Sequence, residues 1–365
     1  MFDFIPIAYY NIIYFNIILL FIIVSFLHTK SASGFSKSTH NFNTVSMFLL
    51  MVFLILYIGF RPVSGMFVDM VSYAKMFDKI EDGSFPPIVN DYGFFITMQF
   101  LVKFHSKTFF FFVLSLLYII PLYIAVKRWF KKYYFFAFLI LASSFSFWAY
   151  GTNGLRNGIS TSLLILAFSF YDKKWVMFIL FALAFSFHSS ALLPIIAYLI
   201  SMLFKSSFVY FSMWLSSILL SLTMGSFWEQ LMLKAGLIKE DKLLAYFGNK
   251  EEYANQFASS GFRWDFLIYS FMPVAVAYYF IFVKKIKDTF YKNLVHTYLL
   301  SNMIWILVIR ASFSNRFAYL SWFMMGIIII YPFLQKVYWK NQFSIIGLLI
   351  LFYFSFTYFM NIIIY

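Results

Sequence analysis

The stretch TFFFFVLSLLYIIPLYIAV at 108–126 decides the fold class, together with the turn KRWFKK at 127–132 and the run YYFFAFLILASSFSFWAY at 133–150. Each apolar run is close to the ~20 residues that a helix needs to cross a bilayer. The turn between them carries four basic residues and no acidic one. Loops of this kind stay on the cytoplasmic side of a membrane. The three segments therefore predict a transmembrane helical hairpin whose turn faces the cytoplasm.

The rest of the chain has the same character. Of its 365 residues, 63% are hydrophobic and 12% are charged. A soluble domain carries about 25% charged residues on its wetted surface, so a water-soluble enzyme is excluded. The chain has no cysteine, which excludes disulfides, thiol nucleophiles and cysteine-ligated metals. It also lacks a phosphate-binding loop, a hydrolase nucleophile elbow and the paired histidines of a metal site, so no metal or cofactor is expected.

Long apolar runs predict about twelve transmembrane helices in a single polytopic domain that covers 1–365. A further run at 92–104 is too short to span a bilayer and predicts a re-entrant or interfacial helix. Because the runs are continuous rather than alternating, we expect an all-α bundle. The twelve runs lie at 5–27, 45–60, 108–126, 133–150, 157–171, 175–187, 190–204, 207–225, 264–283, 293–310, 316–335 and 343–363.

The net charge of +14 would suggest nucleic acid in a soluble protein, but in a membrane protein it reports topology, and no nucleic-acid partner is expected. One set of connecting segments holds 15 basic and 2 acidic residues, which places it in the cytoplasm. The segments that alternate with it hold 13 basic and 12 acidic residues, and we expect them outside. The long outer segments are 61–107, which includes the interfacial run, and 226–263.

The segment 175–204 allows two interpretations. Thirty residues make about 45 Å of helix, which is less than the roughly 60 Å that two crossings need. Lys173, Lys174 and Lys205 nevertheless put both ends on the basic side, which favours a hairpin that bends at His188. One long helix is the alternative, and it would reverse the sidedness of every later segment.

Polar residues gather in the segments expected outside. Asp69 and Tyr73 are four residues apart and share a face if this piece is helical, although a solvated loop fits equally well. In WAYGTNGLRNG at 148–158, three glycines and two asparagines surround Arg156. Free backbone N–H groups beside a guanidinium suit a phosphate or a carboxylate. An arginine that reaches toward lipid headgroups is the alternative.

One histidine and two arginines are the remaining polar candidates in the segments expected outside. His188 lies between two apolar runs, where it is either a packing residue or a group that exchanges protons with a substrate. Arg310 and Arg316 end neighbouring runs. Because charge is costly there, the two arginines suggest a bound anion unless they face lipid.

In their order along the chain, these motifs resemble those of the EpsG-like group of bacterial polysaccharide polymerases, the Wzy-type O-antigen or exopolysaccharide polymerases. The resemblance covers roughly residues 50–335. The chain departs from the usual pattern at Asn157, where glutamine is more frequent, and at Asp91, where glutamate is. The latter makes the acid near 91 a poor candidate for catalysis. The motifs are Arg61 with Asp69-x-x-x-Tyr73, Asp91-Tyr92-Gly93-Phe94, Leu155-Arg156-Asn157, Phe187-His188-Ser189-Ser190-Ala191 and Asn315-Arg316-Phe317-x-Tyr319.

The resemblance implies a membrane glycosyltransferase with a GT-C-like bundle in the bacterial inner membrane, whose site faces the periplasm or the cell exterior. A growing glycan would move from undecaprenyl pyrophosphate to a sugar hydroxyl of an incoming lipid-linked repeat unit. Membrane lipids and a chain-length regulator are further expected partners. An O-antigen ligase-like transferase and a lipid-linked oligosaccharide flippase are the alternatives. The ionisable residues cluster at one face, which favours an enzyme over a transporter.

The resemblance also implies roles for single residues. A pyrophosphate gains charge as it leaves, so guanidinium groups would stabilise the transition state. Neutral His188 is the first candidate for the base that activates the acceptor hydroxyl, and Asp69 is its rival. The arginines expected to bind pyrophosphate are, in order of preference, Arg156, Arg316, Arg310 and Arg61. The residues expected to bind the sugars are Tyr73, Asn153, Asn157 and Tyr319.

Overall fold

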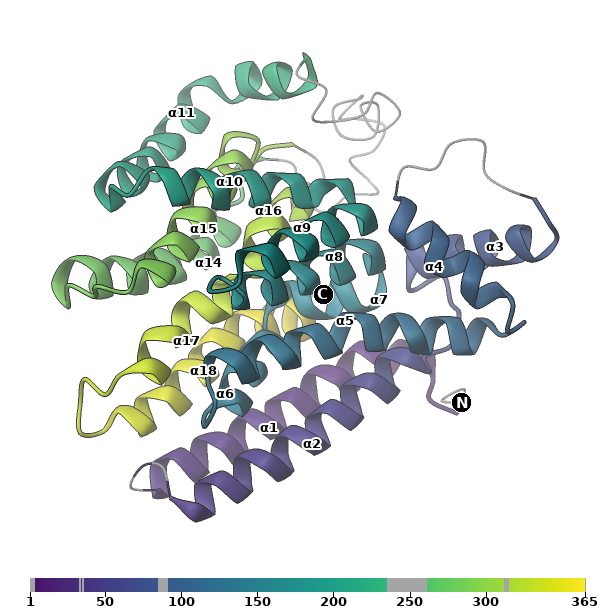
Figure 1. The fold of residues 1–365 in the computed structure, drawn as a ribbon, viewed down its shortest axis with the longest axis horizontal. Coiled ribbons are helices and arrows are strands. Elements are labelled where there is room, and N and C mark those ends of the chain that lie inside the picture. The colour runs from purple at the N-terminus through teal and green to yellow at the C-terminus, as the bar shows by residue number, and fades with distance from the viewer. Residues whose placement is uncertain are drawn as a thin grey trace. The chain divides into compact units, whose positions relative to one another are not determined.

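The computed structural model of the protein describes residues 4–32, 34, 36–84, 91–234, 261–311 and 315–364, without the side chains of residues 229, 233, 315 and 316. Within these ranges the chain is helical and contains no β-strand, as Figure 1 shows. Helices satisfy their backbone hydrogen bonds internally, which is the requirement that lipid imposes. The predicted all-α class is therefore confirmed.

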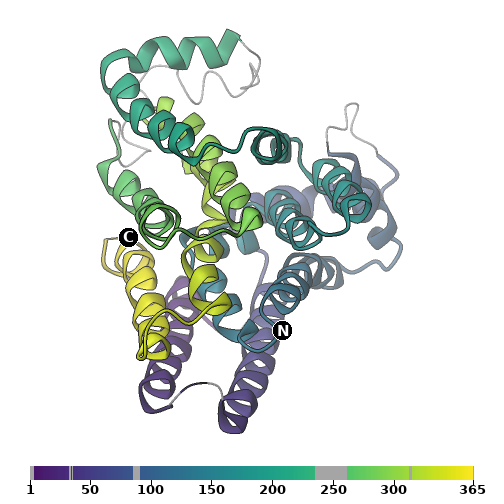
Figure 2. The same ribbon diagram turned by 60° about the vertical axis from the view of Figure 1, so that its left-hand side comes forward.

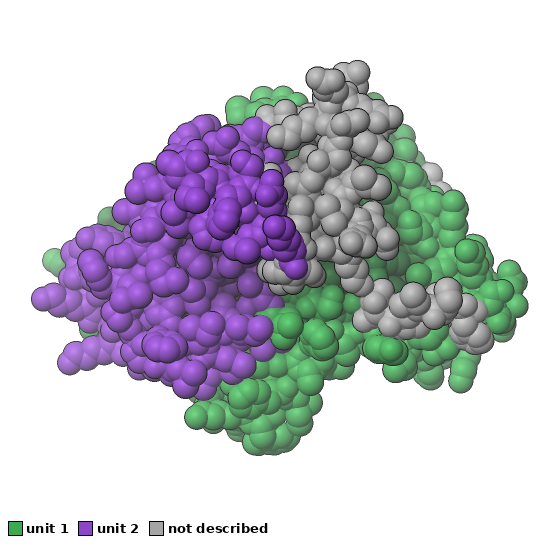
Figure 3. All heavy atoms as spheres, turned by 90° about the horizontal axis from the view of Figure 1, so that it is seen from above, with its two compact units in different colours: residues 1–192, 330–365 green, residues 193–329 purple. Residues whose placement is uncertain are grey.

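The chain divides into two compact units, which are coloured separately in Figure 3. Unit 1 comprises residues 1–192 and 330–365, and unit 2 comprises residues 193–329. Helix α17 (Met325–Gln335) begins in unit 2 and ends in unit 1. The single polytopic domain expected from the sequence stays a prediction.

Unit 1 is built around α8, which packs between α5 and α9. Ser160 Oγ in α8 donates a hydrogen bond of 2.8 Å to the Ala184 carbonyl of α9, a contact between small polar groups that is typical of close helix pairs in membranes. Helices α1 and α18 lie side by side, and α2 packs on α5 (Figures 1 and 2). The helices of unit 1 are η1 (Ile7–Tyr9), α1 (Tyr10–Ser31), α2 (Lys37–Gly59), α3 (Val68–Glu81), α4 (Tyr92–Val102), α5 (Lys107–Trp129), α6 (Tyr134–Ala142), α7 (Phe145–Thr152), α8 (Leu155–Ser169), α9 (Lys174–Phe187), η2 (Ser189–Ala191), α18 (Gln342–Tyr358) and η4 (Phe359–Ile364).

Unit 2 is built around α15, which packs against α11, α14 and α16. A buried amide joins these helices, because Asn302 Oδ1 accepts a 2.8 Å hydrogen bond from Trp214 Nε1. Asn302 Nδ2 lies 3.3 Å from Ser270 Oγ and 3.0 Å from Ser321 Oγ. The helices of unit 2 are α10 (Leu192–Leu203), α11 (Ser207–Lys234), α14 (Trp264–Tyr278), η3 (Tyr279–Val283), α15 (Thr289–Leu307) and α16 (Asn315–Trp322).

Seven helical segments in the described ranges are long and apolar enough to cross a membrane, or eight if a bent pair counts as one span. The chain is therefore a multi-pass membrane protein, but the predicted count of twelve spans is not confirmed. The run 133–150 is broken between α6 and α7, whose axes differ by 72°. The runs 157–171, 175–187 and 190–204 form helices of only 15, 14 and 12 residues, of which the last follows a short 3₁₀ turn.

The chain is not one continuous helix over 175–204. Helix α9 ends at Phe187, and His188 has extended backbone angles (φ −159°, ψ 126°). These angles lie far from those of an α-helix. One continuous helix over 175–204 is therefore excluded, because the helix is interrupted at His188, and the predicted hairpin stays a prediction.

The two long segments that the sequence places outside both contain helix. Helices α3 and α4 occupy much of 61–107, and α4, with 11 residues, is as short as predicted for the interfacial run. The first residues of the predicted loop 226–263 continue α11 as far as Lys234, beyond a kink at Met224. Residues 235–260 lie outside the described ranges.

Candidate functional site

Arg156 lies in the first turn of α8, directly after a tight turn from α7. Gly154 occupies the N-cap position and supplies no side chain to accept from the first backbone N–H groups of the helix. Gly158 allows the turn to close, since a Cβ atom there would lie 2.7 Å from the Tyr150 carbonyl oxygen. Gly158 therefore lets α7 and α8 approach closely, and Gly154 leaves the N-terminus of α8 without a side-chain cap.

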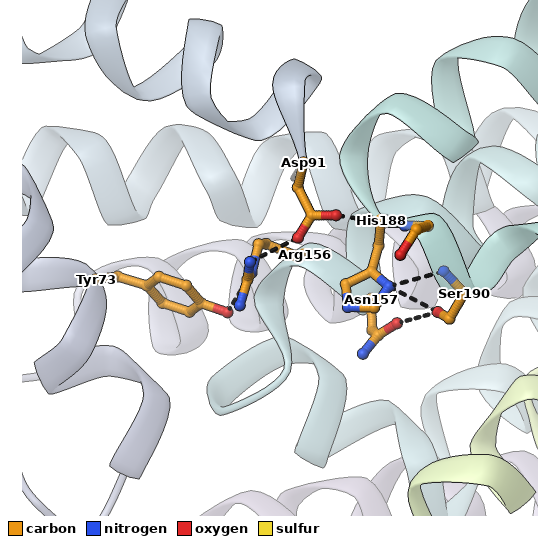
Figure 4. Close-up of polar contacts among 7 residues, drawn as sticks. Tyr73, Asp91, Arg156, Asn157, His188 and Ser190 are labelled. Carbon is orange, nitrogen blue, oxygen red and sulfur yellow. Dashed lines mark hydrogen bonds and ion pairs between the residues drawn. The ribbon is translucent and has the colours of Figure 1, made fainter. Parts of the chain in front are cut away.

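The Arg156 side chain is held by a carboxylate and a phenol, as Figure 4 shows. Its Nη1 lies 2.6 Å from Asp91 Oδ2, and its Nε donates a 3.2 Å hydrogen bond to the Tyr73 hydroxyl oxygen. The guanidinium carbon also lies 5.5 Å from the centre of the Tyr73 ring. The Asp91 side chain is only 7% exposed, whereas that of Arg156 is 36% exposed. The cation is thus fixed in direction but still open to solvent.

Asp91 connects this arginine to the motif around His188. It precedes α4, and its second oxygen, Oδ1, accepts a 3.3 Å hydrogen bond from the backbone N–H of Ser189. One buried carboxylate therefore holds the start of α8 and the turn after α9 together. The sequence interpretation made the acid near 91 a poor candidate for catalysis, and this anchoring contact assigns it no catalytic role.

His188 belongs to a second polar cluster beside the first (Figure 4). Its Nδ1 accepts a 3.1 Å hydrogen bond from the backbone N–H of Ser190. The Ser190 hydroxyl lies 2.7 Å from the same Nδ1 and 2.7 Å from Asn157 Oδ1. Arg156 and Asn157 are adjacent in α8 and contact different clusters. Arg156 contacts Asp91 and Tyr73, and Asn157 contacts Ser190.

Tyr73 keeps its proton in this environment. Burial raises the pKa of the Tyr73 hydroxyl, Arg156 lowers it in part, and the nearby carboxylates of Asp69 and Asp91 raise it again. The Tyr73 hydroxyl oxygen accepts from Arg156, so its own proton can be donated elsewhere. Tyr73 and Asp69 lie one turn apart in α3, as the sequence spacing predicted, and Asp69 is half-buried.

Arg61, for which the sequence predicts pyrophosphate binding, is a buried residue, and its predicted role stays a prediction. Its side chain is buried, donates to the Ile58 carbonyl and donates a 3.0 Å hydrogen bond to the Thr152 carbonyl. The guanidinium also lies over the rings of Phe67 and Phe111. Burial lowers its pKa. These contacts favour a structural role, in which Arg61 joins the end of α2 to the end of α7.

Asn153 stands at the end of α7, immediately before the turn that leads to Arg156. Its Oδ1 is buried and accepts no hydrogen bond from the described residues. A buried carbonyl without a donor is costly, so a hydroxyl or amide from a bound molecule would stabilise it. The predicted contact between Asn153 and a sugar stays a prediction.

The remaining predicted residues belong to unit 2. Arg310 is exposed and donates a 3.3 Å hydrogen bond to the Leu222 carbonyl. The ring of Tyr319, which is half-buried, lies 5.6 Å from that of Trp322. The side chain of Arg316 lies outside the described residues. The roles assigned to these three residues stay predictions.

The sequence interpretation included Asp91 and Ser190 in its motifs but assigned neither residue a role in the site. An acidic residue directly before a short apolar helix is a usual N-terminal signal, and this position could have marked Asp91 as an anchor. Ser190 had no comparable signal, because its importance depends on the neighbouring imidazole and on an amide 33 residues away.

The chain matches a known protein family. The model of the EpsG family matches residues 44–365 of the chain, a range that contains all of the residues discussed above. No curated protein and no solved structure matches the chain.

Proposed function

Because the chain belongs to the EpsG family, we propose that it is a membrane polysaccharide polymerase that acts on lipid-linked sugars. In the reaction, a growing glycan leaves undecaprenyl pyrophosphate and is joined to a sugar hydroxyl of an incoming lipid-linked repeat unit. The protein lies in the bacterial inner membrane with its site facing the periplasm or cell exterior, as the basic turns 127–132 and 284–292 predict. A GT-C-like bundle of about twelve spans is part of this proposal.

The observation that carries the proposal is the geometry of Arg156. A guanidinium has five N–H donors, and the described residues occupy two of them. Arg156 stands in the first turn of α8, whose N-terminus has no side-chain cap, and guanidinium groups and helix N-termini both favour a phosphate. Asp91 and Tyr73 hold the group in place before the substrate arrives, so little reorganisation is needed as charge develops on the leaving pyrophosphate.

The transfer itself needs no redox step. The acceptor hydroxyl oxygen attacks the anomeric carbon and forms a new glycosidic bond. The bond between that carbon and the phosphate oxygen breaks, and its electron pair stays on the pyrophosphate. The hydroxyl proton passes to a base, for which His188 and Asp69 are the candidates.

Glycan length measured in cells tests the proposal. Deleting the gene should remove long chains and leave single repeat units on the lipid carrier. If the protein were a flippase, its deletion would leave no repeat unit at the surface. Arg156→Ala should reproduce the loss of long chains. Turnover should fall about 10²–10³-fold, the range found when one donor to a developing anion is removed.

Arg128→Ala is the matched control. Arg128 also pairs with an aspartate, with Nη2 3.2 Å from Asp172 Oδ1, and lies over an aromatic ring, that of Phe170. It belongs to the turn expected in the cytoplasm, so its loss should leave chain length unchanged. Normal chain length in Arg156→Ala, or an equal loss in both variants, would contradict the role of Arg156.

A further inference from the structure

A buried histidine joins the starts of α11 and α15 at one end of unit 2. The His296 side chain of α15 is buried, and its Nε2 lies 2.8 Å from Ser207 Oγ in the first turn of α11. Its ring stacks on that of Tyr210, with 4.0 Å between the ring centres. Further along, Trp214 donates to Asn302, so the two helices run parallel from this end.

Two lysines lie close to this histidine. Lys205 stands two residues before α11, and Lys292 lies in the first turn of α15. The charges of both ammonium groups act on the His296 imidazole, which places the two lysines around one buried group. Both belong to the basic segments that the sequence predicts on the cytoplasmic side. The structure therefore brings together two basic segments that are distant in the sequence.

The Lys205 side chain is held in place by neutral acceptors. Its Nζ donates hydrogen bonds of 3.2 Å to the Ser201 carbonyl of α10 and to Asn293 Oδ1 of α15. Asn293 is only 7% exposed, whereas Lys205 is exposed. An ammonium has three N–H donors, so one donor of Lys205 remains for a ligand.

The two lysines have no counter-ion among the described residues, since neither forms an ion pair within those ranges. The segment 284–292 contains four lysines and one acid, Asp288. Asp288 is the N-cap of α15, and its Oδ1 accepts a 3.0 Å hydrogen bond from the Tyr291 N–H. Because Lys205 and Lys292 repel each other, an anion that contacts both would stabilise this end of unit 2.

Exposed apolar side chains flank Lys205 along the chain. Leu203, Phe204 and Phe208 are 77%, 66% and 71% exposed. The candidate span in α11 begins at Ser207, so Lys205 lies at the end of a membrane-crossing segment. Lysines at this level meet the phosphates of lipid headgroups, and apolar side chains next to them meet acyl chains. This combination favours a phospholipid over a soluble phosphate.

We propose that Lys205 and Lys292 bind the phosphate of an anionic phospholipid in the adjacent membrane leaflet, with Asn293 positioning Lys205. The ammonium groups donate to the phosphate oxygens, and the acyl chains lie against the exposed apolar side chains beside Lys205. The charge pattern predicts that this leaflet is the cytoplasmic one. The site belongs to unit 2, whereas Arg156 belongs to unit 1, so the inference does not depend on the proposed polymerase function.

Native mass spectrometry of the full-length protein in detergent counts the bound lipids and measures their affinity. The titration compares phosphatidylglycerol with zwitterionic phosphatidylcholine and with soluble glycerol 3-phosphate. We expect phosphatidylglycerol to bind at least about tenfold more tightly than either, since it offers both the charge and the acyl chains. Equal binding of phosphatidylcholine would overturn the requirement for an anion. Equal binding of glycerol 3-phosphate would overturn the assignment to a lipid.

Substitution of the two lysines tests the position of the site. The double variant Lys205→Gln, Lys292→Gln should weaken phosphatidylglycerol binding about 10²-fold, because each hydrogen bond to a charged group contributes about tenfold. The matched control, Lys37→Gln with Lys340→Gln, removes two exposed lysines from other basic segments and should weaken binding less than about threefold. An equal loss in both double variants would overturn the site, since net charge alone would then explain the attraction.

Thermal unfolding separates lost binding from a folding defect. Phosphatidylglycerol should raise the melting temperature of the wild type and of the control by the same amount, and that of the site variant by less. The melting temperatures without lipid report any loss of packing separately. An equal rise in the site variant would overturn the proposal. Arg156→Ala should bind phosphatidylglycerol as the wild type does, and loss of the lipid in this variant would overturn the assignment to unit 2.

Discussion

Removing Asp91 and removing Arg156 from their ion pair should lower the free energy of unfolding by different amounts. Asp91→Asn leaves the guanidinium unpaired, but Arg156 is 36% exposed and water can solvate it. The asparagine oxygen can still accept from the Ser189 N–H. Arg156→Met leaves a carboxylate that is only 7% exposed and has no cation in contact. The second change should therefore cost more free energy of unfolding than the first.

The magnitudes follow from the two exposures. Breaking a buried ion pair costs about 3–5 kcal/mol, and exposed pairs contribute at most about 1 kcal/mol. We expect about 1 kcal/mol for Asp91→Asn, near the exposed limit, and about 3 kcal/mol for Arg156→Met, near the buried one. The double variant leaves no unpaired charge, so it should be more stable than Arg156→Met alone.

Unfolding of the four proteins in one detergent measures these differences. Denaturant titration followed by tryptophan fluorescence gives the relative free energies, and glycan length reports activity separately. The reasoning is refuted if Asp91→Asn destabilises the protein more than Arg156→Met does. It is also refuted if the two effects add to within about 0.5 kcal/mol, because independent sites behave in that way.

Two further substitutions test the packing of each unit. Gly158→Ala places a Cβ atom 2.7 Å from the Tyr150 carbonyl oxygen, and we expect a loss of about 1–3 kcal/mol with reduced polymer length, measured by unfolding and glycan gels. Stability equal to wild type would show that α7 and α8 do not need this close approach. Asn302→Leu removes the partner of Trp214 Nε1 and of Ser270 Oγ, and should cost about 1–2 kcal/mol in unit 2. A variant as stable as wild type would contradict a stabilising role for this network.

The sequence predicted several residues of the candidate site, but it did not predict the hydrogen bonds and the ion pair that join them. Tyr73, Arg156 and His188 were identified because charged and aromatic groups at the edge of apolar runs are costly unless they bind something. Their connection through Asp91 was not predictable, since Asp91 lies 65 residues from Arg156 and 98 from Ser189. Sequence spacing carries no information about contacts over such separations unless the fold is known.

Helix boundaries show the same limit. Pro121 and Pro273 lie inside α5 and α14, although proline usually ends or bends a helix. The sharp break between α6 and α7 instead occurs at Ser143 and Ser144, in a run without proline or glycine. Ser143 Oγ donates a 2.9 Å hydrogen bond to the Ile140 carbonyl, a contact that competes with continuation of the helix.

The sequence by itself determined that this chain is an all-helical membrane protein of the EpsG type. Continuous apolar runs indicate that lipid surrounds the chain. In lipid, an α-helix can pair the backbone N–H and C=O groups within one segment. Only the tertiary structure decided which groups each polar side chain contacts. It buried Arg61 against backbone carbonyls, paired Arg156 with Asp91, and set the Nδ1 atom of His188 against a backbone N–H. The reason is physical, because the function of a charged or titratable group depends on partners within a few ångströms, and these partners come from distant parts of the chain.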